Sequence, residues 1–339
     1  MFFAVPLIGY SVLVMVATIV FFLSCYTSFS AGLIPMGLLQ GVILISLVYQ
    51  YRIESVESLL KNKTQNVEST YEVEDFLNGF SVLSGALAAF GLSVEFGLGA
   101  VVASCIVGIM ATLLVPDYDV PVYCGAFVGM ASPAVVSGYT FVGLAGFLAG
   151  LLFVASRDTF AGFGGKLGTI AFSGGIVTAL LTGTELSSSS VPGWNIGQYL
   201  VLYSVIGAVA TFFLNESLGH SAVTSSAVVG LLGGLLLPIV YPVFGETLAV
   251  MVVCASYAGM SSLSRIPNGA YMAVAGAFCA LVFMFTSPYF GGLGGKLGTI
   301  AFGSVTAIRG MQKLSYRFTE PLAKWNENET TGAINEIGD

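Results

Sequence analysis

Charged side chains are scarce in this sequence. Only 9% of the 339 residues are Asp, Glu, Lys or Arg, whereas 56% are hydrophobic and the mean hydropathy is +0.90. A soluble domain carries about 25% charged residues, so this chain lacks the charge to cover a water-facing surface. Apolar runs close to the roughly 20 residues that a spanning helix needs recur along it. The composition predicts an all-α, polytopic integral membrane protein and argues against a soluble one.

Residues that carry chemistry are also few. His220 is the sole histidine, so it cannot build a zinc or haem site by itself. The five cysteines lie in apolar contexts without CxxC spacing, which is typical of packing residues rather than of disulfides or a metal site. The sequence contains no recognisable set of nucleophile, base and acid, and no basic surface that suggests nucleic acid. We therefore expect no enzyme, no metal, no cofactor and no nucleic-acid partner.

The N-terminal segment lacks the basic region of a cleaved signal peptide. Its apolar run, residues 2–25, is longer than a signal core, so residues 1–51 are expected to form two retained transmembrane helices. Residues 52–73 are predicted to be a polar cytoplasmic loop, whose first part is either an amphipathic helix or solvated. Residues 313–339 are expected to form a charged cytoplasmic tail, whose acidic end at 327–339 lacks fixed structure.

An internal duplication organises the remaining sequence. The nonapeptide Gly-Gly-Lys-Leu-Gly-Thr-Ile-Ala-Phe occupies residues 164–172 and again residues 294–302. Such self-similarity marks repeated structural units, here residues 74–184 and 196–312 with a connector at 185–195. Each unit is predicted to contain five membrane segments. They are 74–94, 97–116, 120–138, 139–156 and 166–184 in the first unit, and 197–214, 221–241, 247–264, 269–286 and 296–312 in the second.

The number of segments in a unit decides its orientation. Five spans in each unit turn the second unit upside down, giving two inverted repeats and about 12 membrane segments in all. With both termini in the cytoplasm, this arrangement places all Lys and Arg residues except Lys296 inside, as the positive-inside rule favours. If the third segment is re-entrant, about 10 segments span and Arg157 and Lys166 also move outside. We prefer the inverted arrangement, in the inner membrane of a bacterium.

The fifth segment of each unit is the first candidate site. Lys166 and Lys296 follow the glycine-rich turns that contain Gly165 and Gly295. Glycine lets the backbone approach a ligand closely, and free N–H groups at a helix start attract anions. Together with Thr169 and Thr299, these residues are predicted to form two half-sites for an anionic or strongly polar solute. The alternative is that the glycines pack helices and the lysines only anchor them at the membrane surface.

The third segment of each unit is the second candidate. Residues 124–132 and 254–262 match one another and are rich in small residues. Phe127 and Tyr257 occupy matched positions as potential gates, and Ser132 and Ser262 end the two stretches. These four residues are predicted to line a solute path. Close helix packing through small residues is the alternative.

Inverted repeats of this kind build transporters and channels, with substrate sites at the repeat interface. The sequence therefore predicts a channel or facilitative transporter for a small polar or anionic solute, embedded in the lipid bilayer. Ionisable residues of the proton-relay type are not expected deep within the spans, which argues against a proton pump. A non-transporting membrane subunit or effector that acts with a protein partner is the alternative, and assembly into a homo-oligomer is left open.

Overall fold

The computed structural model describes residues 4–64 and 73–336, and the side chains of residues 6–55 and 73–316. Within these residues the chain is all-helical and has no strand, as predicted. The helices in chain order are α1 (Ala4–Ser30), α2 (Ile34–Thr64), α3 (Val73–Val94), α4 (Ala100–Leu114), the short η1 (Pro116–Tyr118), α5 (Asp119–Gly129), α6 (Tyr139–Ala155), α7 (Lys166–Thr182), α8 (Trp194–Phe212), η2 (Phe213–Ser217), α9 (Ala222–Val240), α10 (Gly245–Gly259), α11 (Gly269–Thr286) and α12 (Lys296–Glu336).

Several of these helices have the length and apolar composition of membrane spans. Among the described residues, α1, α2, α3, α8, α9 and α11 meet both requirements. Helices α4, α6, α7 and α10 are apolar but shorter. Large hydrophobic side chains remain exposed along the long helices, for example Ile45 on α2 and Phe76 on α3. Because water-facing helices do not expose such continuous apolar surface, the protein is membrane-embedded.

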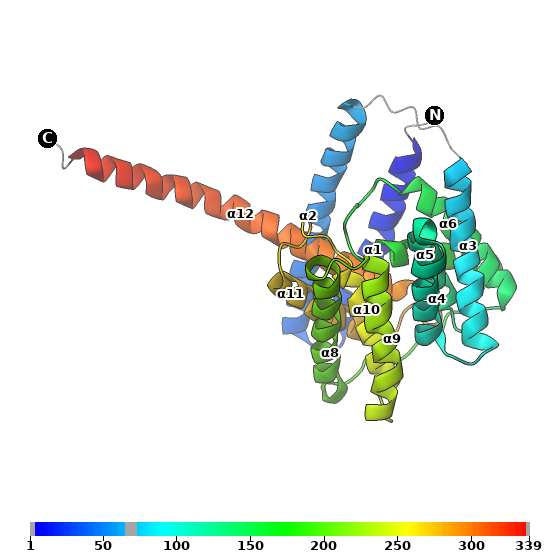
Figure 1. The fold of residues 1–339 in the computed structure, drawn as a ribbon. Helices are drawn as coiled ribbons and strands as arrows, with labels where there is room; N and C mark the ends of the chain where they lie inside the picture. Colours follow the sequence, from blue (N-terminus) through cyan, green and yellow to red (C-terminus); the bar gives the residue numbers. More distant parts are fainter. Residues whose placement is uncertain (1–3, 65–72, 337–339) are drawn as a thin grey trace.

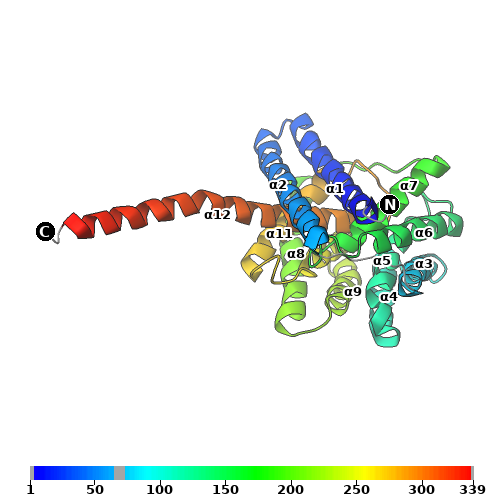
Figure 2. The ribbon, with the colours of Figure 1, turned by 90° about the horizontal axis from the view of Figure 1, so that it is seen from above.

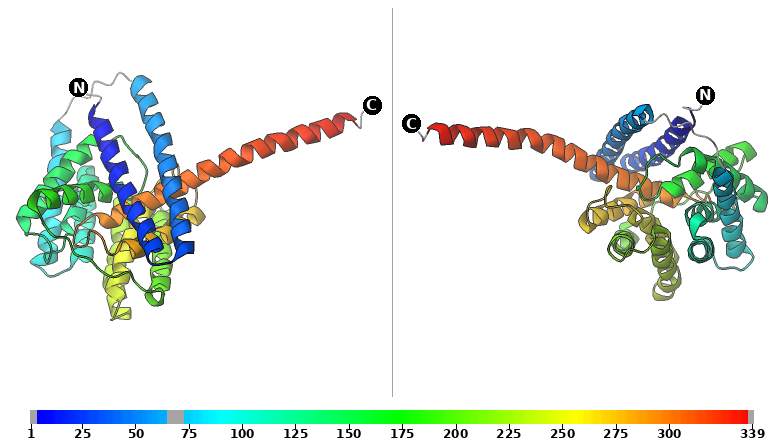
Figure 3. Two further views of the ribbon diagram at one scale, coloured as in Figure 1. Left: turned by 180° about the vertical axis from the view of Figure 1, so that it is seen from behind. Right: turned by 45° about the horizontal axis from the view of Figure 1, so that its top comes forward.

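The helices differ in direction. Helices α1, α2, α3 and α9 run roughly upright in Figure 1, whereas α12 leaves the body at a large angle and extends beyond it. Seen from above, α7 and α12 run outward from the centre in opposite directions (Figure 2). Helices α1 and α2 lie side by side against α12 (Figure 3). The two copies of the nonapeptide thus begin at the centre of the molecule.

The duplicated sequences pack in the same way. Helix α3 contacts α5 and α6, and its counterpart α8 contacts α10 and α11. Glycines make both sets of contacts close. A Cβ atom at Gly129 would lie 2.5 Å from the Ala86 carbonyl oxygen, and one at the matched Gly259 would lie 2.6 Å from that of Ala208. The sequence repeat is therefore also a repeat of helix packing, of the small-residue kind common in membranes.

Local sequence explains where the central helices begin and end. Gly165 and Gly295 adopt left-handed φ angles of 80° and 84° directly before α7 and α12, a conformation that glycine reaches without strain. The Asn268 side chain accepts hydrogen bonds from the amides of Ala270 and Tyr271 and so caps the start of α11. Gly183, with φ of 65°, ends α7 through a bond from its amide to the Ala179 carbonyl.

Helices α5, α10 and α12 differ in length from the predicted segments. Helix α5 ends at Gly129 and α10 at Gly259, and turns follow, with Pro133 after the first and Pro267 after the second. The residues of α5 rise only about 16 Å, well short of a hydrocarbon core of about 30 Å. At the C-terminus, α12 continues as a helix to Glu336, where we expected no fixed structure. Lys, Leu, Glu and Ala, which favour helices, recur in this stretch. Residues 65–72 of the predicted loop and 337–339 of the predicted tail lie outside the described residues.

Candidate functional site

The two nonapeptides cross each other at the centre of the molecule. A Cβ atom at Gly168 would lie 2.5 Å from the Cα of Gly298, and one at Gly298 would lie equally close to the Cα of Gly168. Helices α7 and α12 therefore touch backbone to backbone in their first turns. Thr169 and Thr299 are fully buried at this crossing. No room for a solute is left between the two helices at this point.

Each lysine of the nonapeptide holds the end of a neighbouring helix. Lys166 Nζ donates to the carbonyls of Ser156 and Arg157, at 2.7 and 3.0 Å, directly after α6. Lys296 Nζ donates to the carbonyl of Thr286, the last residue of α11, and to that of Tyr289, both at 2.6 Å. Helix ends leave carbonyls without intrahelical partners, and a cation is favourable there. Each ammonium uses two of its three protons in this way.

The loop that precedes each nonapeptide forms a hydrogen bond with the other unit. The Ser132 amide, just after α5, donates to the Gly292 carbonyl at 2.9 Å, and the Ser262 amide, just after α10, donates to the Gly162 carbonyl at 3.0 Å. Both loops contain a phenylalanine in a left-handed conformation, Phe160 with φ of 52° and Phe290 with φ of 56°. Such backbone strain is uncommon for a large side chain and clusters at functional sites.

An aromatic cluster fills the contact between α5 and α10. The rings of Phe127 and Tyr257 lie 4.2 Å apart between centroids, and Tyr123 lies 4.4 Å from Phe127. All three side chains are buried, at 1% exposure or less. The hydroxyl of Tyr257 donates to the sulfur of Met130 at 3.4 Å. The matched positions of the two units therefore meet in the interior of the molecule.

A cavity of about 370 Å³ touches this aromatic cluster at Phe127. Its wall is mainly apolar, with Phe127, Phe153, Phe160 and Phe163 among its residues. Charges of both signs also line it, namely Lys166, Arg157 and Asp119. The starts of α5 and α9 and the end of α10 form the remaining wall. A concave, mostly apolar cavity with a few polar groups is the usual form of a small-molecule site.

No protein-family model, curated protein or solved structure matches this chain. The site must therefore be interpreted from its own geometry. Among the predicted site residues, Phe127, Gly165 and Lys166 line the cavity, and Tyr257 packs behind Phe127. The other predicted residues lie outside the cavity lining. Thr169 and Thr299 lie in the helix crossing, and the amides of Ser132 and Ser262 bind the loop of the other unit. Gly295 and Lys296 form the same lysine cap in the second unit.

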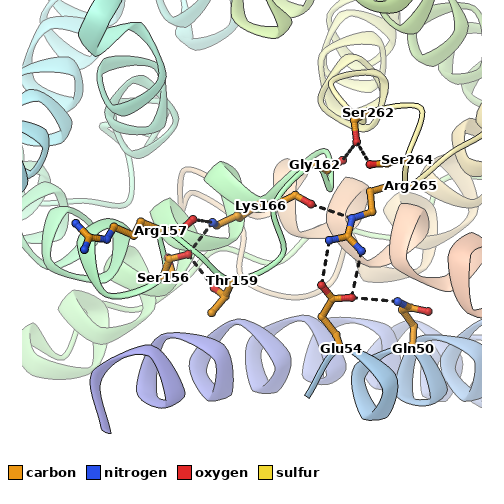
Figure 4. A network of polar contacts seen from close by, with 11 residues as sticks. Gln50, Glu54, Ser156, Arg157, Thr159, Gly162, Lys166, Ser262, Ser264 and Arg265 are labelled. Atoms are coloured by element: carbon orange, nitrogen blue, oxygen red, sulfur yellow. Dashed lines mark hydrogen bonds and ion pairs between the residues drawn. The ribbon is translucent and has the colours of Figure 1, made fainter. Parts of the chain in front are cut away.

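An ion-pair network beside the cavity was not foreseen. The guanidinium of Arg265 donates to the Glu54 carboxylate at 3.1 and 3.3 Å, and its Nε donates to the Ala161 carbonyl at 2.9 Å (Figure 4). The same guanidinium lies 4.5 Å above the ring of Phe163, which lines the cavity. Glu54 was expected in a polar loop, but α2 continues through it and buries its side chain to 10% exposure. Its spacing of four residues from Gln50, which donates to it, was the available signal.

A second ion pair includes Arg157, which also lines the cavity. Arg157 binds Asp75 at 2.7 Å and Asp158 at 3.5 Å. Asp75 lies in the first turn of α3 and its side chain is 8% exposed, whereas that of Arg157 is 47% exposed. The cavity, Lys166 and both ion pairs thus occupy one side of the molecule, which we call the charged side. In the loop before α12, Gly291 and Ser287 instead pair with the serine-rich connector through Ser187 and Ser189.

Proposed function

We propose that this protein is a membrane channel or facilitative transporter that moves a small polar or anionic solute through a path between its two repeats. In this proposal the repeats are inverted, and the N-terminal helices α1 and α2 pack against the second repeat. The path enters through the cavity on the charged side and continues past Phe127 and Tyr257. Channels and transporters built from inverted repeats place their sites at the same kind of interface.

The observation that carries the proposal is a cavity that reaches the contact between the matched aromatic residues. Lys166, Arg157, Asp119 and Phe127 all line it, and Phe127 touches its counterpart Tyr257. A buried pair of rings at the midpoint of a duplicated fold is the arrangement expected of a closed gate. Side-chain and helix motions on microsecond to millisecond timescales suffice to open such a contact.

The distribution of charge supports the inverted arrangement. Arg157, Lys166 and Arg265 gather on the charged side together with Glu54 and Asp75. The matched loop of the second unit instead contacts uncharged serines of the connector. Basic residues favour the cytoplasmic side. Labelling with a membrane-impermeant maleimide tests the arrangement: Ser188→Cys and Ser264→Cys should react from opposite sides, and reaction from the same side contradicts inversion.

Flux measurements in proteoliposomes test the proposed path. Ala222 lines the cavity and is partly accessible. A bulky thiol reagent attached to Ala222→Cys should therefore block solute entry, whereas the same reagent on Val243→Cys should not, because Val243 is 93% exposed and lies outside the cavity lining. The native cysteines are buried except for the partly buried Cys25, so background labelling is small.

Equal flux after both modifications would place the path elsewhere. Flux no greater than that of protein-free liposomes, for every solute tried, would remove the proposal and favour a membrane subunit that acts with a partner. Stoichiometric co-purification of a soluble protein would then be the next measurement.

A further inference from the structure

A chain of buried hydroxyl groups joins three helices next to the aromatic cluster. The Tyr123 hydroxyl on α5 lies 3.2 Å from Ser226 Oγ on α9, and Ser226 Oγ lies 2.9 Å from Ser256 Oγ on α10. Ser256 in turn donates to the Val253 carbonyl at 2.9 Å. All three side chains are 0% exposed. We call Tyr123, Ser226 and Ser256 the hydroxyl chain.

The hydroxyl chain lies next to residues that line the cavity. Val120 and Phe127 on α5, Val223 on α9 and Met260, directly after α10, all line it. Residues three or four positions apart share a helix face, so each member of the hydroxyl chain has a lining residue one turn away. Tyr123 lies between Val120 and Phe127 along α5, and its ring contacts Phe127. A movement of the Phe127 ring away from Tyr257 therefore uncovers the hydroxyl chain.

Within the described residues, the hydrogen bonds and ring contacts of the hydroxyl chain involve no charged side chain. Phe127, Tyr257 and Met130 are its neighbours in the aromatic cluster. The charged residues that line the cavity have both signs, since Asp119 is acidic and Lys166 and Arg157 are basic. Two protons of Lys166 already bind backbone carbonyls. At the crossing itself, Gly168 and Gly298 leave no space for a solute between α7 and α12.

These observations favour one class of solute. An ion that entered this layer would lose its water without gaining an opposite charge, which costs far more than the loss suffered by a neutral polar molecule. A neutral molecule with hydroxyl or amide groups can exchange hydrogen bonds with hydroxyls, which both donate and accept. The chemistry of the layer therefore matches a solute that is small, uncharged and able to form hydrogen bonds.

We propose that Tyr123, Ser226 and Ser256 form the selectivity element of the path, and that the solute is an uncharged hydrogen-bonding molecule rather than an anion. The inference rests on the proposed transport function and narrows it to one solute class. When the Phe127 and Tyr257 rings separate, the solute replaces the bonds within the hydroxyl chain one by one. Lys166 and Lys296 then serve the structure of the path and do not bind the solute.

Flux of two matched solute pairs tests the inference. Glycerol and lactamide are neutral, whereas glycerate and lactate have similar size and carry a negative charge. Proteoliposomes with the full chain should take up the neutral members faster than protein-free liposomes do, while the anions stay at background. An imposed membrane potential should leave neutral uptake unchanged. Ser226→Ala and Tyr123→Phe should each lower it several-fold, as expected for one lost hydrogen bond.

Ser225 provides the matched control. It neighbours Ser226 on α9, is 1% exposed, and its hydroxyl makes no hydrogen bond within the described residues. Ser225→Ala should leave neutral flux unchanged. Tyr123→Phe keeps the ring, so it remains informative if Ser226→Ala fails to fold.

Three results would overturn the inference. Uptake of glycerate or lactate above background, with the neutral members at background, shows an anion path and leaves the proposed transport function standing. Equal effects of Ser225→Ala and Ser226→Ala show that the hydroxyl chain only joins helices. Background rates for all four solutes contradict the transport function itself, and are distinguished from the first result because no solute moves.

Discussion

Lys166 and Lys296 are the residues whose interpretation changes most. The sequence left two alternatives, an anion site or an anchor at the membrane surface. In the structure each ammonium binds two carbonyls at the end of α6 or α11. The lysines thus join the start of the fifth helix of each unit to the end of the fourth. Their identical placement in both units explains why the nonapeptide is repeated with its lysine.

Replacing these lysines should weaken the fold. Lys166→Met and Lys296→Met each leave two carbonyls without their charged donor, and hydrogen bonds to charged groups are worth about 1.5–3 kcal/mol. We expect each variant to melt several degrees below the parent protein in detergent, measured by intrinsic fluorescence. Asp117→Asn, which changes an exposed charge, should not shift the melting temperature. Unchanged melting combined with abolished flux would instead assign the lysines to solute binding.

The glycines of the helix crossing should tolerate no side chain. Gly168→Ala or Gly298→Ala places a methyl group 2.5 Å from the opposing Cα. Because both contacts are backbone, the helices must separate, at a cost of about 1–3 kcal/mol. Gly143→Ala on α6 is the control, since no atom lies within 4 Å of its added methyl. Thermal unfolding should rank the two crossing variants below this control. Equal stability would contradict the close crossing.

Among the elements, those with a clear sequence boundary were the easiest to predict. The predicted segments 139–156 and 269–286 correspond to α6 (Tyr139–Ala155) and α11 (Gly269–Thr286), because Gly138 and Asn268 mark their starts. Helix α5 was predicted too long, since apolar residues continue after Gly129 where the backbone forms turns. Apolar composition shows which residues avoid water, but not where helical hydrogen bonding stops. Helix α2 shows the reverse error, because Glu54 is polar and yet buried against Arg265.

The contact between α2 and the loop from α10 to α11 should depend on both charges of the pair Glu54 and Arg265. Glu54 and Arg265 side chains are 10% and 18% exposed. Arg265→Gln leaves a buried carboxylate without its partner, and breaking a buried pair costs about 3–5 kcal/mol. The Glu54→Gln/Arg265→Gln double variant should lose less stability than the two single variants together. Asp158→Asn removes an exposed partner, 83% exposed, and should have little effect. Additive losses in this double-mutant cycle, measured by chemical unfolding, would show that the pair is not coupled.

For the whole molecule, the duplication was visible in the sequence but the arrangement of the site was only partly so. Matching Phe127 with Tyr257 followed from the repeat, and the structure brings their rings together. The hydroxyl chain could not be foreseen, because Tyr123, Ser226 and Ser256 come from three helices that only the packing of the units brings together. The charged side likewise arises from contacts between distant segments, such as Arg265 with Glu54. Both features depend on how the units face each other, which local sequence does not record.

The most direct test of the path is the rate of solute entry in variants that lack one of the two central aromatic rings. Phe127→Ala and Tyr257→Ala each remove one ring of the pair that closes the cavity, whereas Phe96→Ala removes a ring that is 73% exposed elsewhere. Proteoliposomes containing each variant would be challenged with glycerol, and light scattering would report its entry. The path between the repeats predicts faster entry for both central variants and an unchanged rate for Phe96→Ala. Identical rates for all three variants and the parent protein would contradict it.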